Sequence, residues 1–194
     1  MAIDTGLAID CTDLQATGGI KQILLRSWAD GDAIVYGSST HTITSIKDTG
    51  GTDADWGVYE FKNETPALTI NATKENGSTA FECGLSFTLP RMEVAKFNAI
   101  QDMLNACLMI IAVDTNDKAF VLGVSEKYRN ESVAYRSQTF GQFASAEGGS
   151  GAAYSDENGI TISLMARQFD MPREYVPSAT GITVAATGLT ATTD

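Results

Sequence analysis

Residues 90–123 read PRMEVAKFNAIQDMLNACLMIIAVDTNDKAFVLG, and this stretch decides the fold. Its first half predicts a helix over about 91–106, because apolar residues recur every three or four positions. The members of this stripe are Val94, Phe97, Ile100, Leu104 and Cys107. The apolar run 108–113 that follows is too short and too β-branched for a second helix. With the turn at 114–117 it predicts a hairpin, against which the helix packs its stripe.

The sequence on both sides of this module predicts further strands. Residues 81–89 alternate apolar and polar side chains at nine consecutive positions, which indicates a strand with one face in a core. Asn76-Gly77 and Asn158-Gly159 supply the backbone geometry of tight hairpin turns. Residues 160–167 then repeat the alternation. The chain is therefore expected to be mainly β: an antiparallel β-barrel or sandwich with one flanking α-helix, long loops and terminal arms.

The 194 residues fit one domain with an extension at each end. We expect an N-terminal arm over 1–19, a β-barrel domain over 20–176 and a C-terminal extension over 177–194. The extension is rich in Thr, Ala and Gly, so it is either a disordered tail or an arm that orders on another subunit. Within the domain, the acidic glycine-rich segment 48–57 and the small-residue segment 141–151 predict exposed loops.

The net charge of −11 excludes one class of function and permits another. A protein that grips nucleic-acid phosphates needs clustered Lys and Arg, which this chain lacks. An acidic surface could still let nucleic acid pass without sticking, and solubility alone is the simpler explanation. The chain begins without a signal-peptide pattern and contains no apolar stretch of membrane-spanning length. We therefore expect a soluble protein made in a cytoplasm, with no membrane partner.

Residues that could carry chemistry do not form a catalytic set. His41 is the only histidine and lies in a Ser/Thr-rich run without a nucleophile motif. The acidic turn at 114–117 lacks the glycine and the final glutamate of a calcium loop. The three cysteines are widely spaced, which supports neither a zinc site nor a disulfide framework. We expect no enzymatic activity, no cofactor and no metal.

A few aromatic, acidic and apolar residues are candidates for contacts between subunits. Trp56 is the foremost, because it stands in the acidic loop and Trp is enriched at interfaces. Aromatic residues could instead form a sugar-stacking platform or fill the core. The full set of subunit-interface candidates is Tyr36, Asp53, Asp55, Trp56, Phe143, Ile182 and Val184.

The order of these features resembles a known family. The resemblance rests on six segments: Gly18–Ile20, Val58–Phe61, Leu85–Leu89 before the helix, Ile110–Gly123, Ser150–Ala152 and Asp156–Ile162. In this order they are similar to tail tube (major tail) proteins of double-stranded DNA bacteriophages, in particular tail structural proteins of phages that infect Bacteroidetes. The likeness covers about residues 18–167.

The resemblance implies a structural virion protein that forms stacked, hexameric rings. Such rings would build a tail tube that conducts DNA during ejection, with an acidic lumen that repels the phosphates. The implied partners are other copies of the chain, further tail or neck proteins, and passing DNA without specific binding. The arm 1–19, the loops 48–57 and 141–151 and the extension 177–194 would bridge subunits or rings. The alternatives are a head–tail joining or capsid decoration protein of similar fold, and a ligand- or glycan-binding β-sandwich.

Overall fold

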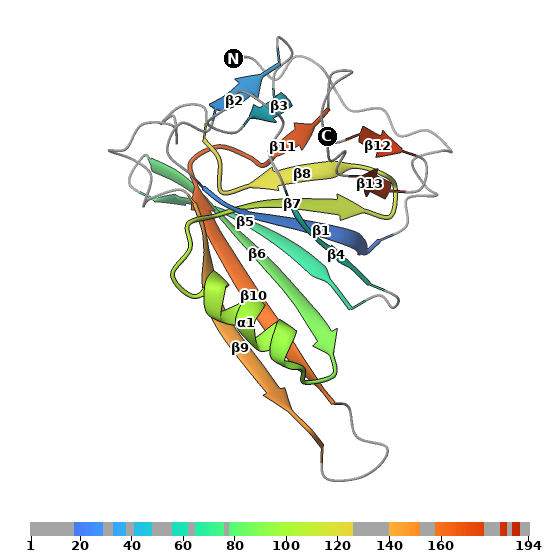
Figure 1. The fold of residues 1–194 in the computed structure, drawn as a ribbon. Coiled ribbons are helices and arrows are strands. Elements are labelled where there is room, and N and C mark those ends of the chain that lie inside the picture. The colour runs from blue at the N-terminus through green and yellow to red at the C-terminus, as the bar shows by residue number, and fades with distance from the viewer. Residues whose placement is uncertain are drawn as a thin grey trace.

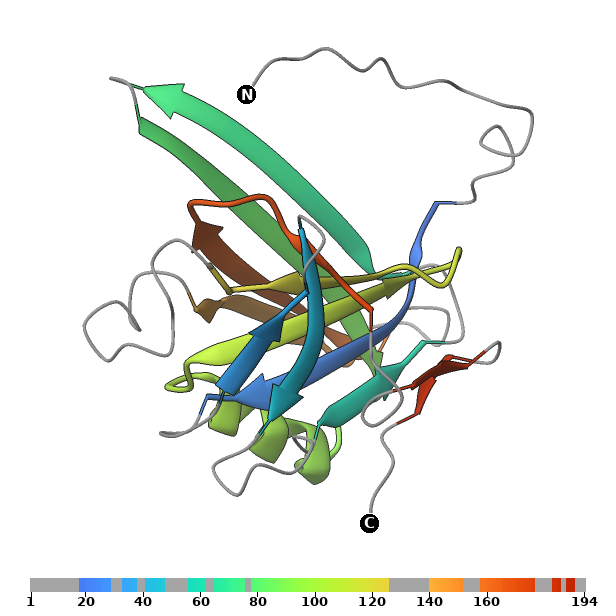
Figure 2. The same ribbon diagram turned by 90° about the horizontal axis from the view of Figure 1, so that it is seen from above.

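The computed structural model describes residues 18–28, 33–37, 41–47, 56–61, 65–75, 78–125, 140–151, 158–176, 183–185 and 188–190 (Figures 1 and 2). Its elements, in chain order, are β1 (Ile20–Ser27), β2 (Ala33–Tyr36), β3 (Thr42–Lys47), β4 (Gly57–Glu60), β5 (Ala67–Glu75), β6 (Ser78–Pro90), α1 (Val94–Met103), β7 (Leu108–Asp114), β8 (Ala119–Leu122), β9 (Gly141–Gly149), β10 (Gly159–Gln168), β11 (Arg173–Tyr175), β12 (Thr183–Ala185) and β13 (Gly188–Thr190). The prediction of a mainly β chain with one helix is confirmed.

Eleven strands form one sheet that folds into two layers. Its order is β2-β3-β11-β8-β7-β9-β10-β6-β5, with β1 joined to β7 and to β4. Only the pair Leu108–Gly141 joins β7 to β9, and the sheet turns at this point. We call β2, β3, β11, β8, β7, β1 and β4 the first layer, and β9, β10, β6 and β5 the second layer. Over the described strands the sheet stays open, so a sandwich fits better than a closed barrel; all pairs are antiparallel except β11–β3.

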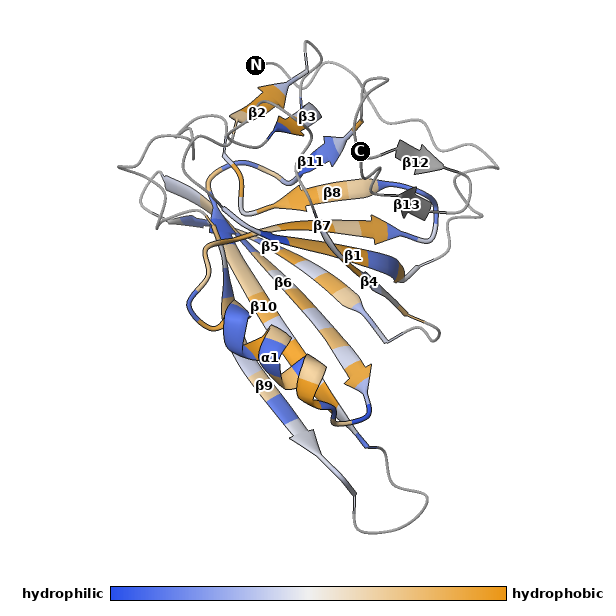
Figure 3. Cartoon of the chain, viewed as in Figure 1, coloured by the Kyte–Doolittle hydropathy of each residue, from blue (hydrophilic) through white to orange (hydrophobic). Residues whose placement is uncertain are grey.

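Strand β7 is the centre of the fold because both of its faces are buried. Met109, Ile111 and Val113 belong to a core cluster on one face of β7, to which buried residues of β2 and β3 also belong. Ile110 and Ala112 belong to the cluster between the two layers, which we call the inner core. A strand covered on both faces has a continuous apolar sequence, and Figure 3 shows this in β7.

The second layer follows the predicted alternation. Its central strands β6 and β10 pair along ten residues each, and Cys83, Leu85 and Phe87 of β6 point into the inner core. Thr88 and Thr161 meet on the opposite face, where their hydroxyls lie 3.0 Å apart. We call the two sides of this layer the inner face and the outer face. The second layer thus has one apolar face and one polar face.

Strand β9 is a correction to the predicted loop at 141–151. Residues 141–149 pair with β10 over most of its length, although they carry almost no apolar pattern. Small residues are needed here because the strands approach closely. A Cβ atom on Gly148 would stand 2.7 Å from the carbonyl oxygen of Gly159. Backbone pairing with β10, more than burial of side chains, therefore holds this strand.

Helix α1 is shorter than predicted and is rotated relative to the prediction. It spans ten residues, and the stripe expected to pack on the β structure is largely in water. Val94 is 73% exposed, and Phe97 and Leu104 are each 44% exposed. The helix packs on the inner core through Met103, with Ala99, Ile100 and Ala106 half-buried beside it. The predicted direction of the stripe was therefore wrong.

The rotation of α1 has a local cause at its start. The amide of Arg91 donates to the carbonyl of Asn158 at 2.8 Å, and the amide of Met92 donates to the side chain of Asn158 at 3.2 Å. Arg91 has a positive φ of 62°, which turns the chain sharply before the helix. These contacts with the start of β10 fix the angle at which α1 begins.

Candidate assembly interface

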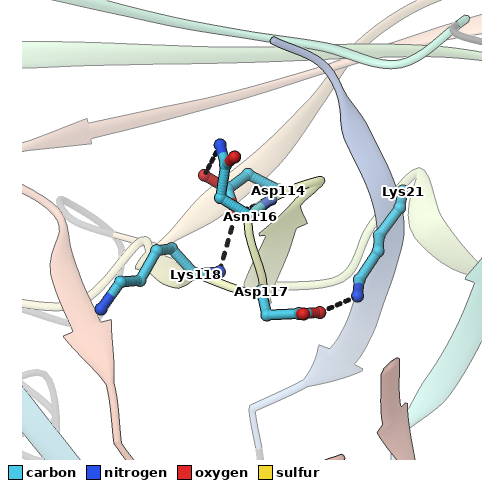
Figure 4. Close-up of polar contacts among 5 residues, drawn as sticks. All are labelled: Lys21, Asp114, Asn116, Asp117 and Lys118. Atoms are coloured by element: carbon cyan, nitrogen blue, oxygen red, sulfur yellow. Dashed lines mark hydrogen bonds and ion pairs between the residues drawn. The ribbon is translucent and has the colours of Figure 1, made fainter. Parts of the chain in front are cut away.

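The acidic turn between β7 and β8 is held by hydrogen bonds from its backbone amides to the side chain of Asp114 (Figure 4). The Oδ1 atom of Asp114 accepts hydrogen bonds from the amides of Asn116 at 2.9 Å and Lys118 at 2.7 Å. Asp117 adopts a positive φ of 63°, as tight turns require. Within the described ranges, no group of three or more His, Cys, Asp or Glu residues could hold a metal ion. The turn chemistry accounts for these acidic residues.

Two ion pairs tie this turn to neighbouring strands. Lys21 of β1 pairs with Asp117, and Lys118 pairs with Glu174 of β11 at 2.7 Å. The hydrogen bond to Glu174, and then its charge, raise the pKa of Lys118. The amide of Thr115 also donates to the carbonyl of Gly19 at 3.2 Å. These contacts fix the start of β1, the point at which the predicted N-terminal arm joins the domain.

His41 has a structural role at a turn, through its backbone. It has a positive φ of 67°, and its carbonyl accepts a hydrogen bond from the amide of Glu174 at 2.9 Å. The residue therefore helps to align β3 with β11, the one parallel pair of the sheet. The serines that precede it, at 38 and 39, lie outside the described residues.

Two open hollows lie on the described surface. One, of about 320 Å³, is lined mainly by apolar residues at the starts of β1 and β5, among them Ile20 and Pro66, and by Phe120 of β8. The other, of about 210 Å³, lies between α1 and β1 and includes Tyr59 and Asp102. Burial and the charge of Asp102 raise the pKa of Tyr59. Both volumes are at or below the lower limit for small-molecule sites.

β5 and β9 are the two edge strands of the second layer. Both are nine residues long, and each pairs along its length with one neighbour only among the described strands. Their residues are mostly small or hydroxyl-bearing and mostly exposed. The charged residues are Lys74 and Glu75 at the end of β5 and Glu147 in β9. Long, weakly charged edges are templates for pairing with another chain.

The outer face of the second layer is polar but carries little charge. Glu82 and Arg167 form an ion pair across β6 and β10, which removes two of its charges. Strand pairing assigns the remaining side chains to this face. They include Thr69, Asn71 and Thr73 of β5, Ser78, Ser86 and Thr88 of β6, Gln142, Ser145 and Glu147 of β9, and Thr161, Ser163 and Met165 of β10. The result is a surface of hydroxyls and amides with a slight acidic excess.

The predicted interface residues are dispersed in the structure. Trp56 is only 8% exposed and belongs to the core of its own chain, so we do not assign it to an interface. Tyr36 packs against the same cluster, with the Arg173 guanidinium carbon 5.2 Å from its ring centre. Phe143 of β9 packs against the inner core.

The other candidates lie near or beyond the limits of the described structure. Val184 is in β12, where it pairs with Leu189 of β13. Asp53, Asp55 and Ile182 lie outside the described residues. Sequence reasoning missed the two surfaces on which an assembly could form, the β9 edge and the exposed side of α1. A run of Gly, Ala and Ser gives no periodic signal that could have revealed this edge.

Compared with known proteins, the chain matches no family model, and no curated protein matches its sequence. A separate finding concerns membranes: none of the helical segments in the described ranges has the length and apolar character needed to cross a bilayer.

Proposed function

We propose that the protein is a structural subunit of a phage tail tube, in which the second layers of neighbouring copies join into one continuous wall. β5 of one copy would pair with β9 of the next. The observation that carries this proposal is the pair of long, exposed and weakly charged edges on one four-stranded layer. Joining them satisfies their backbone groups and removes the edges.

The strand directions support such a joint. All four strands of the second layer are antiparallel to their neighbours, so β5 and β9 run in opposite directions. When copies are related by rotation about an axis, the β5 of one therefore meets the β9 of the next in antiparallel orientation. Every junction then has the same geometry as the pairs inside the layer, and the interface repeats until the ring closes.

The required offset between the edges matches a barrel. Within one copy, strand pairing places Gly141, the first residue of β9, level with Ile70 of β5. The two edge strands are therefore staggered, and each extends beyond the other at one end of the layer. Pairing them along their full length needs an offset of about four residues, an even number that keeps each face on its own side. Across the four strands of a copy, this offset amounts to one residue per strand. It corresponds to a strand tilt of about 35° from the barrel axis, which lies within the range of β-barrels.

The outer face would line the channel, because α1 and the first layer cover the inner face. Six copies would form a wall of 24 strands with a backbone diameter of about 45 Å, wide enough for duplex DNA. The only described cation on this face is Arg167, which Glu82 neutralises. Without free cations there is little counterion release to hold DNA, and the slight acidic excess repels its phosphates.

Proline substitutions in β5 test the joint. The backbone N–H groups of consecutive residues in a strand point to opposite sides. One of the two residues Asn71 and Ala72 therefore directs its N–H toward β6, and the other directs it toward the open edge. We expect one of the variants Asn71→Pro and Ala72→Pro to keep the unfolding midpoint and lose assembly, because proline removes an outward N–H. Negative-stain microscopy and sedimentation of concentrated protein measure this. Rings formed by both variants would refute the joint.

Microscopy also separates this proposal from the alternatives. Stacked tubes support a tail tube, whereas single closed rings that never stack indicate a joining component. A monomer at every concentration that binds sugars on an array would instead support a glycan-binding module.

A further inference from the structure

Helix α1 carries an apolar stripe that its own chain leaves exposed. The stripe consists of Val94, Phe97 and Leu104, and its neighbour Ile100 is only half-buried. Single exposed apolar residues are common on protein surfaces, but here two of them on α1 and a third at its C-cap share one side of the helix. The opposite side of the helix already supplies its contacts to the inner core. The stripe is therefore surplus to the fold of one copy.

A second, partly exposed apolar surface lies on β5, at an edge of the second layer. Ile70 of β5 pairs with Cys83, so its side chain is on the inner face, where it remains 40% exposed. Leu68 is on the same face and is half-buried against the inner core. Ile100 of α1 and Phe143 of β9 pack against this core as well. The stripe and the β5 residues therefore lie on the same side of the second layer, with β5 at one of its edges.

We propose that Leu68 and Ile70 of one copy pack against the α1 stripe of the next copy. This inference rests on the proposed pairing of β5 with β9. With the offset that pairs both edges fully, Ile70 stands opposite Ala146 and Leu68 opposite Gly148 of the neighbouring β9. Beyond Phe143, the inner face of β9 has only these two small residues. The neighbour's branched side chains fill the space that they leave beside the helix.

This contact makes the ring interface two-sided. The backbone joint alone would be a polar ladder of modest strength, and the apolar contact adds burial that is absent from the monomer. It also selects the register, because a slip by one residue turns Leu68 and Ile70 to the outer face, away from α1. The interface is heterologous: each copy offers the stripe at one edge and the β5 residues at the other.

Cysteine cross-linking tests the contact directly. In a background with Cys11 and Cys107 changed to serine, the double variant Phe97→Cys/Ile70→Cys should form a ladder of disulfide-linked chains upon mild oxidation of assembled protein. The matched control is Met165→Cys/Ile70→Cys, because Met165 is similarly exposed but lies on the outer face. We expect no ladder from the control. Assembled particles in which the Phe97/Ile70 variant yields no ladder, or in which the control yields an equal one, would overturn the inference.

A second measurement uses the strength of assembly. Phe97→Ser should raise the concentration of half-assembly at least about tenfold, the loss expected when a half-exposed phenylalanine no longer gains burial. Met171→Ser, at a comparably exposed site in the connection between β10 and β11, should change it less than about twofold. Circular dichroism confirms that both variants fold. If wild type forms rings and Phe97→Ser assembles equally well, the α1 contact is refuted and the proposed ring is not. If wild type never assembles, both proposals fail.

Thiol labelling of Phe97→Cys identifies what covers the stripe. We expect fast labelling in dilute monomer and at least about tenfold slower labelling in assembled protein. Equally slow labelling in both would mean that another segment of the same chain covers the helix, which would contradict contact with a second copy.

Discussion

The thiol of Cys83 shows how completely the centre of the inner face of the second layer is shielded from water. It is 1% exposed, and burial raises its pKa from the usual 9.0 to about 11. The thiolate is the reactive form, so at pH 8 Cys83 should be alkylated at least roughly a hundredfold more slowly than a free cysteine. Mass spectrometry after timed iodoacetamide treatment measures the rate, with half-buried Cys107 as the internal comparison. Equal rates for the two cysteines would mean that the layers open in solution.

Individual residues also mark where sequence reasoning reaches its limit. Trp56 was expected at a subunit contact because it stands in the acidic segment 48–57, but its ring is buried in the core of its own chain. Composition of the neighbouring segment did not reveal this, since long-range packing decides where a large ring goes. Ile20 and Ile23 likewise share the inner core despite their odd spacing, because a register shift after Ile20 turns β1 by one residue.

At the scale of elements, what could be predicted depends on where the signal lies. β7 and β6 were predictable because their own side chains specify continuous or alternating burial. β9 was not, because pairing with β10 defines it and its side chains are small. The periodicity of α1 was visible, but its rotation depends on contacts between residue 91 and Asn158, which lie far apart in sequence.

The β7–β8 turn allows a prediction about a single element. Asp114→Ala should lower the free energy of unfolding by about 1–2 kcal/mol, because two backbone amides lose their acceptor. Asp114→Asn keeps an oxygen at the same place and should cost less than half as much. Urea denaturation of both variants measures the difference. Equal losses for Ala and Asn would mean that the charge of Asp114, and not its hydrogen bonds, stabilises the turn.

At the scale of the whole molecule, the polar outer face and the polar edges lie on the same layer, and both differ from the tightly packed centre. A single copy leaves β5, β9 and one side of α1 uncovered, while both faces of β7 are fully packed. The molecule is thus fully packed at its centre, whereas the edges of its second layer remain exposed. Such a distribution is what the proposed tube requires of its subunit, because the remaining contacts would come from further copies, and the net charge of −11 would make those copies repel one another before assembly.

The C-terminal extension provides the test at this scale. β12 and β13 form a separate two-stranded sheet, which in the described structure pairs with no strand of the main sheet. Removing residues 178–194 should therefore leave the thermal unfolding midpoint within about 2 °C of wild type. If the extension bridges subunits or rings, the truncated protein should still fold but form fewer or shorter tubes by negative-stain microscopy. Tubes of normal length would refute the bridging role, and a large fall in the midpoint would assign the extension to the fold of its own chain.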